Sequence, residues 1–384
     1  MSLFAGVGIT LALFFGLLLL TKRDACTADR WLSAWFFTLF FHAAYLLAAV
    51  EQTPLPVFVA AICHPLFLLY GPIILSYVMQ VSAKQPISLW HFVPYGFFVV
   101  SLFVVGQFGD KLGVAISFEG LNIVNHDGSV GWLFLLLNAS MGLYLLYPLL
   151  AIKQLKRHKK QIESHYSDLT QVELHWTLVW IGFSLLGVVI AITVSLLPDN
   201  VLEQQTLQWI VFGLIDLQML YAGIKGLQQT QIFVAPAVVE RTPELEPKLQ
   251  QQPEPAQPTK PKSPPPKPVV DLSEDIAFLT GFMQSSKPYL ENSLVSEQLA
   301  NQLKWPTAQL TQVINQGLNQ SFFEFINRYR IEDAKAALVD PKYQNCTILA
   351  VAYDAGFNSK TSFNNAFKKY QGITPSAFKK NHVR

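Results

Sequence analysis

Seven apolar stretches of 18 to 25 residues fill most of the first 233 residues of this 384-residue chain. The hydrocarbon core of a bilayer is about 30 Å thick, and about 20 residues of α-helix are needed to cross it. Each stretch meets or approaches that length, so we predict seven transmembrane helices. In chain order they cover residues 3–20, 31–50, 57–81, 89–108, 131–152, 174–197 and 207–224.

Lysine and arginine alternate between the two sets of loops that these helices would create. Ten of them follow the first, third, fifth or seventh stretch, whereas the other loops hold only Lys111. Short loops rich in lysine and arginine stay in the cytoplasm. We therefore expect a multi-pass protein of the bacterial inner (cytoplasmic) membrane, with the N-terminus outside and everything after the seventh stretch inside. The ten are Lys22, Arg23, Arg30, Lys84, Lys153, Lys156, Arg157, Lys159, Lys160 and Lys225.

The charged residues divide the chain into two chemically different parts. Residues 1–233 hold 11 Lys/Arg and 12 Asp/Glu, whereas residues 271–384 hold 12 and 10 in half the length. The whole chain is 14% charged, against about 25% in an average soluble protein. This composition excludes a single soluble globule. The alternative that the apolar stretches are buried helices of a soluble core does not explain the alternation of charge.

Asp216 lies within the seventh apolar stretch, where an ionisable side chain is costly and marks a candidate functional site. His42 and His64 lie near the middle of the second and third stretches and are its candidate partners. Because histidine titrates near neutral pH, the three residues are candidates for sensing a small-molecule or membrane signal. A hydrogen-bonded packing cluster without a sensing role is the favoured alternative.

Motifs for catalysis or for cofactor binding are absent from the sequence. There is no GxSxG, HExxH, Walker or GxGxxG pattern, and Cys26, Cys63 and Cys346 are too far apart for a zinc site. We therefore expect no enzymatic activity, no cofactor and no metal. A transporter or channel with a regulatory cytoplasmic domain is the alternative functional class, although the paired interrupted helices of transporters are not evident.

Residues 234–270 separate the two parts. Between Pro236 and Pro268, 11 of 33 residues are proline. Proline fixes φ and removes a backbone donor, so no packed element is expected there. We predict a disordered linker that, at about 3.1 Å per residue, reaches on the order of 100 Å.

Residues 271–384 show the periodicity of a small all-helical domain. A short helix capped by Ser296, a turn, and a second helix from Pro306 or Thr307 predict one helix-turn-helix unit. A long helix over 322–339 follows, and the pattern then repeats, with Asn358 or Ser359 capping the last helix of the second unit. Two such units joined by one helix are suited to neighbouring turns of the DNA major groove.

Three segments of this domain carry a family resemblance. They are KPYLENSLVSEQLANQL, FINRYRIEDAKAAL and TILAVAYDAGFNSKTSFNNAFKKYQGITPSAFKK. Over residues 288–380 the chain resembles the DNA-binding domain of AraC-type transcriptional regulators. Its whole arrangement is similar to members of that family in which an integral-membrane sensor replaces the soluble effector domain.

The resemblance implies a set of DNA-contacting residues. Glutamine and asparagine can contact adenine, threonine can contact the thymine methyl group, and lysine neutralises phosphate. Asn365 and Gln312 stand where many relatives have a basic residue, and Asn319 stands where the family usually has glycine. The alternative is that these side chains form solvated helix faces with no role in DNA binding. The candidates are Ala308, Thr311, Gln312, Asn315, Lys360, Thr361, Ser362, Asn365, Lys368 and Lys369.

These observations predict a one-component transcriptional regulator in three parts: a membrane sensor (1–233), the linker (234–270) and a double helix-turn-helix domain (271–384). We expect it to bind promoter sites on double-stranded DNA in response to a signal in the membrane or outside it. By resemblance it is expected to activate transcription. A pair of copies, as in a homodimer, or tethering to the membrane could each raise the DNA affinity of a single domain through effective concentration.

Overall fold

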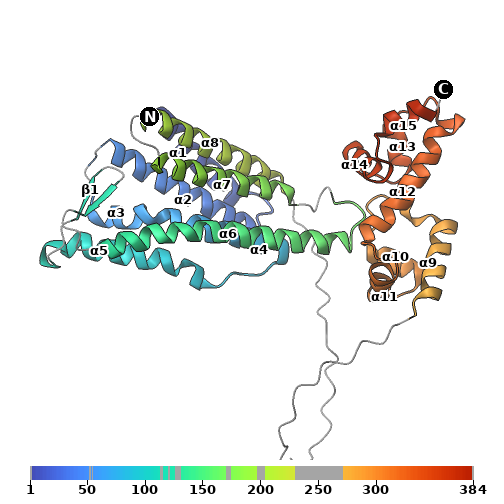
Figure 1. Cartoon of the computed structure of the whole chain (residues 1–384), viewed down its shortest axis with the longest axis horizontal. Coiled ribbons are helices and arrows are strands. Elements are labelled where there is room, and N and C mark those ends of the chain that lie inside the picture. Colours follow the sequence, from blue (N-terminus) through green and yellow to red (C-terminus); the bar gives the residue numbers. More distant parts are fainter. Residues whose placement is uncertain are drawn as a thin grey trace, which may run out of the picture. The chain divides into compact units, whose positions relative to one another are not determined.

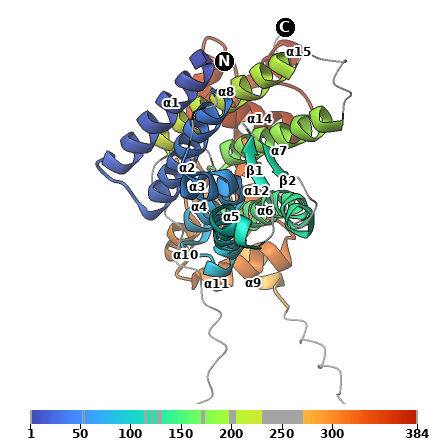
Figure 2. The same cartoon turned by 90° about the vertical axis from the view of Figure 1, so that its left-hand side faces the viewer.

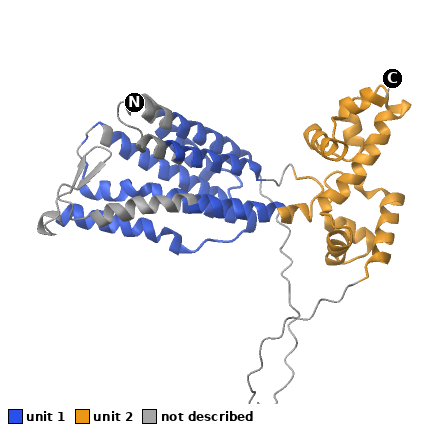
Figure 3. Ribbon diagram, in the orientation of Figure 1, with its two compact units in different colours: residues 1–159, 172–232 blue, residues 160–171, 233–384 orange. Residues whose placement is uncertain are grey.

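The computed structural model describes residues 2–51, 53, 55–112, 116–119, 122–125, 131–169, 174–196, 204–229 and 271–382. The chain forms two compact units, Met1–Lys159 with Val172–Ile232, and Lys160–Gln171 with Phe233–Arg384 (Figure 3). The predicted linker, 234–270, lies outside the described residues. Residues 160–171 were predicted to be part of the membrane domain, but they belong to the unit that contains the C-terminal domain.

Helices of unit 1 coincide with the seven apolar stretches. The third stretch is divided by a 3₁₀ turn, His64–Leu66, around Pro65. α6 continues through Glu163, 11 residues beyond the predicted end at Ile152. The helices are α1 (Ser2–Thr21), α2 (Thr27–Val50), α3 (Val57–Cys63), α4 (Phe67–Ala83), α5 (Val93–Leu112), preceded by the 3₁₀ turn Leu89–Phe92, α6 (Gly131–Glu163), α7 (His175–Leu196) and α8 (Gln204–Gln228).

Three described stretches are long and apolar enough to cross a membrane, judged by length and composition: Thr27–Ala48, Val57–Ala83 and Leu89–Phe108. Gly6–Thr21 and His175–Gly187 are shorter apolar helical stretches within the described residues. The structure therefore agrees with the helical prediction for all seven stretches. The number that cross the membrane stays a prediction.

The helices of unit 1 pack through aromatic side chains and glycines. α1 lies against α2 and α8, α2 against α4, and α7 against α8 (Figures 1 and 2). Trp180 is fully buried, and its ring meets Trp35 edge-on at 5.0 Å and Tyr77 at 5.7 Å. Gly223 of α8 faces the Phe15 ring so closely that a Cβ atom would lie 2.4 Å from it. Small residues at such contacts let helices approach, as they do in membrane proteins.

A short antiparallel hairpin interrupts the helical pattern between α5 and α6. β1 (Ile116–Glu119) pairs with β2 (Asn122–Asn125), with Ile116 opposite Asn125. The hairpin is an exception within the predicted all-α fold, which the described residues otherwise confirm. Every other named element of the described chain is helical.

Unit 2 contains the two predicted helix-turn-helix units, α10 with α11 and α13 with α14 (Figure 1). α12 joins them and has the predicted bounds. The elements are α9 (Ser273–Ser286), the turn Pro288–Leu290, α10 (Ser296–Leu303), α11 (Thr307–Gln312), a π-helical turn over Val313–Gly317, α12 (Phe322–Val339), the turn Pro341–Tyr343, α13 (Ile348–Asp354), α14 (Lys360–Gln371) and α15 (Pro375–His382).

The long helix α12 contributes to two separate cores. Its first half places Phe322, Phe325 and Ile326 against α9, α10 and α11. Its second half places Ile331, Ala334 and Leu338 against α13, α14 and α15. Because a helix repeats every 3.6 residues, one α12 face can enter both cores. The cores are thus joined by a single rigid element.

Helix ends explain most of the local boundaries. The Ser321 hydroxyl accepts a hydrogen bond from the Glu324 backbone N–H at 3.2 Å, and the Glu324 carboxylate accepts one from the Ser321 backbone N–H. Ser359, one of two predicted caps, accepts from the Ser362 N–H at 3.1 Å. The predicted Ser296 cap is wrong: α10 starts at that residue, and the Gln298 side chain accepts from the Val295 N–H instead. Asn319 adopts φ of 53°, as the sequence allowed.

Because α12 belongs to both cores, we expect the two halves of the domain to unfold together. In a fragment of residues 271–384, Phe367→Ala removes a fully buried ring from the second core and should cost about 3–5 kcal/mol. The fragment's single tryptophan, Trp305, lies in the first half, and its fluorescence in urea should show the lowered midpoint. Val339→Ala, at a 41% exposed site, is the control. An unchanged Trp305 midpoint alongside loss of helicity would mean that the halves are independent.

Candidate nucleic-acid interface

The first recognition segment presents four predicted residues from α11 and the turn after it. Leu310 is buried beneath them, so the opposite face is directed outward. Ala308 and Asn315 are exposed, whereas Thr311 and Gln312 are half-buried. The segment differs from the prediction in shape, because the α-helix ends at Gln312 and Asn315 lies on a π-helical turn.

The second recognition helix, α14, is anchored by Phe363 and Phe367, both fully buried. Its outward face carries the remaining predicted residues. Lys360, Thr361, Asn365 and Lys368 are exposed, and Ser362 is half-buried beside the capping Ser359. These four exposed candidates therefore lie on the accessible side of the helix, as contact with DNA would require.

Two lysines of the basic C-terminal region are engaged within the domain. Lys369 Nζ lies 2.9 Å from Glu324 Oε1, joining α14 to the first turn of α12. The hydrogen bond from Lys369 lowers the pKa of Glu324, and the same bond raises the pKa of Lys369. Lys379 donates to three carbonyl oxygens, including that of Gln344 at 3.0 Å. Lys369 was predicted to contact DNA; in the structure its ammonium group forms an ion pair with Glu324.

Arg330 is the most deeply buried charged residue of the described domain, at 1% exposure. It donates to the carbonyl oxygens of Tyr289 at 2.6 Å and Glu291 at 2.7 Å, and its guanidinium lies over the Phe357 ring. Burial lowers the pKa of Arg330 to about 10. Arg330 therefore has a structural role in the domain. Asp333, one turn further along α12, accepts from Lys287 and Tyr289.

Gly356 occupies the tightest backbone position beside this arginine. It has φ of 87°, and a Cβ atom there would lie 2.7 Å from the Tyr289 carbonyl oxygen and 3.0 Å from Arg330 Nε. Both the dihedral angle and the space require glycine. The GF pair of the quoted sequence segment is thus explained by packing around Arg330, with Phe357 beneath the guanidinium.

The three sensing candidates of unit 1 do not come together as predicted. His42 Nδ1 pairs with the Tyr70 hydroxyl, and His64 Nδ1 lies 3.4 Å from the Tyr45 hydroxyl. Asp216 instead faces Gly8 of α1, where a Cβ atom would lie 2.5 Å from its Oδ1. The hypothesis of an aspartate–histidine pair is therefore wrong. Tyrosine hydroxyls, which hydropathy does not reveal, satisfy the histidines.

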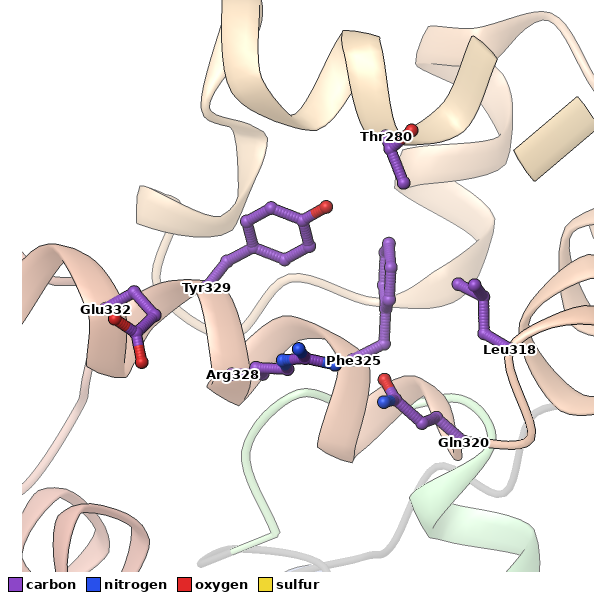
Figure 4. A pocket seen from close by; sticks show the side chains of 7 residues that line it. All are labelled: Thr280, Leu318, Gln320, Phe325, Arg328, Tyr329 and Glu332. Carbon is purple, nitrogen blue, oxygen red and sulfur yellow. The ribbon is translucent and has the colours of Figure 1, made fainter. Parts of the chain in front are cut away.

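A pocket in the first half of the domain lies between α9 and α12 (Figure 4). Phe325 and Tyr329 project from α12 toward Thr280 of α9, and the volume is about 270 Å³. Binding sites for drug-sized molecules usually have volumes of about 300–1,000 Å³. The pocket is below that range, and none of the side chains that line it belongs to α14.

Comparisons with known proteins agree with this geometry. A family model described as a helix-turn-helix domain matches residues 299–381. Uncharacterised HTH-type transcriptional regulators of Staphylococcus aureus strains COL, MSSA476 and N315 are each 30% identical over 91 residues. The matched segment is 24% of this chain and 12% of those regulators.

A solved structure of a protein of unknown function from Listeria innocua is 24% identical, over 28% of this chain and 96% of its own, with a TM-score of 0.25. The family model and the HTH-type regulators match the C-terminal part of the chain, which thus carries a helix-turn-helix domain.

Sequence reasoning missed one part of unit 2. Residues 165–169 pack against the domain from the loop between α6 and α7, and Ser167 is 2% exposed there. The Asn358 side chain, a predicted cap, donates instead to Asp168 Oδ2 at 2.7 Å. No signal in the sequence marks this segment, because polar loops are usual between predicted spans.

Alanine at Gly356 should destabilise the domain by more than the 1 kcal/mol or so of an ordinary Gly→Ala change at positive φ. Gly372→Ala is the matched control, because φ is 75° there but nothing lies within 4 Å of the added atom. Thermal unfolding of the 271–384 fragment should therefore be lowered more by Gly356→Ala. Equal losses in the two variants would contradict the close packing around Arg330.

Proposed function

We propose that this protein is a membrane-integral one-component transcriptional regulator that binds promoter DNA when its membrane part senses a signal. The observation that carries the proposal is the pair of helix-turn-helix units on α12, which expose the polar faces of α11 and α14. The matching helix-turn-helix family supports the DNA-binding half. Activation of transcription and dimerisation on DNA are parts of the proposal.

The chemistry of the exposed faces suits base and phosphate contacts. Asn365 can donate to and accept from adenine in the major groove, and Thr361 can meet a thymine methyl group. Lys360 and Lys368 stand at the two ends of the same exposed face and can neutralise phosphates. Bases and backbone are thus contacted from one helix.

The surface of unit 1 supports a lipid environment. Val100 of α5 is 62% exposed and Leu149 of α6 is 63% exposed, while Trp180 is fully buried. Monomeric soluble proteins rarely expose large contiguous apolar patches. Together with the alternating loop charges, these side chains support placement in the inner membrane, with the linker and DNA-binding domain in the cytoplasm. The signal is then one that reaches the membrane helices from lipid or from outside.

Mapping of genome-wide DNA occupancy by the full-length protein in its host membrane tests the proposal. We expect discrete promoter sites for the wild type, and loss of those sites for the double variant Thr361→Ala/Asn365→Ala, because both side chains face outward from α14. Each lost base contact should cost about 1–3 kcal/mol of discrimination. Membrane abundance of the variant is the control. Occupancy unchanged by the variant would refute the assignment of α14, and no discrete site under any condition would refute the regulator.

Neighbouring lysines of α14 should differ in their effect on the salt dependence of DNA binding. Lys368→Ala removes an exposed charge and should weaken binding similarly for all sequences, with a salt slope smaller by about 1. Lys369→Ala removes the partner of Glu324 and should leave the slope near that of the wild type. Fluorescence anisotropy of labelled promoter DNA over a salt series measures both. A larger slope change for Lys369 would mean that its ion pair opens on DNA.

A further inference from the structure

The loop between α6 and α7 docks on the DNA-binding domain within unit 2 (Figure 3, residues 160–171). Tyr166 and Val295 form an isolated antiparallel pair. The Ser167 N–H donates to the Leu294 carbonyl at 3.1 Å, and the Ser296 N–H donates to the His165 carbonyl at 2.9 Å. The loop therefore adds a minimal strand to the segment that leads into α10. We call residues 165–169 the docking segment.

Side chains from α12 also hold the docking segment. Asn327 Nδ2 donates to the Ser167 carbonyl at 3.1 Å, and Arg330 Nη2 donates to the Ser167 hydroxyl at 3.2 Å. Asn327 is 2% exposed and Ser167 is 2% exposed, so these polar groups are shielded from water. Buried polar groups require partners, which makes Ser167 part of the domain's interior and distinguishes this contact from a loose surface encounter.

The docking segment contacts both helix-turn-helix units as well as α12. At one end, the His165 carbonyl occupies the backbone N–H of Ser296, the first residue of α10. At the other end, the Asp168 carboxylate lies 2.7 Å from Asn358 Nδ2, immediately before the cap of α14. The docking segment therefore spans the surface between the two helix-turn-helix units.

Those two positions are ones where helix-turn-helix proteins meet the DNA backbone. The first helix of such a unit crosses the phosphates, and backbone N–H groups at helix N-termini commonly donate to phosphate oxygens. The Ser296 N–H is already hydrogen-bonded to the His165 carbonyl oxygen, and the Asp168 carboxylate beside the start of α14 repels phosphate. The docking segment and the DNA backbone would therefore bind to the same surface of the two helix-turn-helix units.

We propose that the docking segment is an autoinhibitory element, so that the docked state does not bind promoter DNA and the signal acts by releasing it. This inference rests on the proposed function and adds its regulation. The segment is continuous with α6 on one side and precedes α7 on the other, so a change in either helix reaches the domain through the chain itself. The apparent affinity for DNA is then the intrinsic affinity reduced by the fraction of undocked protein.

Loss of docking contacts should increase DNA affinity. The experiment uses the full-length protein in lipid nanodiscs and a labelled promoter fragment recovered from occupancy mapping. Ser167→Ala/Asp168→Ala should tighten binding about fivefold or more, because more of the protein is undocked. Ser164→Ala is the matched control, since its hydroxyl donates only to the Gln161 carbonyl at the end of α6 and its affinity should equal that of the wild type.

A disulfide that locks the docked state gives the opposite result and does not depend on weakening the fold. Tyr166 and Val295 are a non-hydrogen-bonded antiparallel pair, whose Cα separation of about 4.5 Å suits a disulfide. Oxidised Tyr166→Cys/Val295→Cys should bind at least about tenfold more weakly than its reduced form, and reductant should restore binding. Tyr166→Cys alone controls for the native cysteines.

The outcomes separate the inference from the proposed function. If the wild type binds promoter DNA and the locked form binds equally well, or if Ser167→Ala/Asp168→Ala does not tighten binding, autoinhibition is wrong and the regulator stands. If the cysteine pair does not cross-link in membranes, docking itself is wrong. If no form of the protein binds promoter DNA, both the proposed function and the autoinhibition that rests on it are wrong.

Discussion

The arrangement of the DNA-binding domain depends on one buried guanidinium. Arg330 lies halfway along α12, between the two cores that this helix serves, and donates to backbone carbonyls of the segment before α10. An unpaired buried charge is strongly destabilising, so those carbonyls and the Phe357 ring must stay in place. Gly356 has no side chain because the space beside the guanidinium is already filled. The spacing of the two recognition helices therefore depends on contacts buried inside the domain.

The same arginine connects the domain to the docking segment. Its Nη2 atom reaches the Ser167 hydroxyl as well as the Glu291 carbonyl, so one side chain contacts elements on three parts of the chain. Asp168 lies close enough to favour the charged form of Arg330. The residue that contacts both helix-turn-helix units thus also binds the docking segment. Because one side chain makes both sets of contacts, the surface between the two helix-turn-helix units is suited to regulation.

Much of the fold was predictable because its signals are local. Apolar stretches predicted the helices of unit 1, and apolar residues along one helix face predicted α12. The outward faces of α11 and α14 followed from the buried Leu310, Phe363 and Phe367. The sequence did not reveal the tertiary contacts: His42 and His64 pair with tyrosines, Lys369 pairs with Glu324, and Ser167 docks on a domain more than 100 residues away in sequence. Pairing of this kind leaves no periodicity in the sequence.

The docking segment is covalently tied at both ends, since it lies in a loop of the same chain whose C-terminal domain it contacts. Its binding is therefore an intramolecular equilibrium, set by an effective concentration and not by how many copies the cell makes. Raising expression would increase the number of regulators without changing the fraction that is docked. Expression and signal would then act separately: expression sets how many copies exist, and the signal sets the fraction of them that can bind DNA.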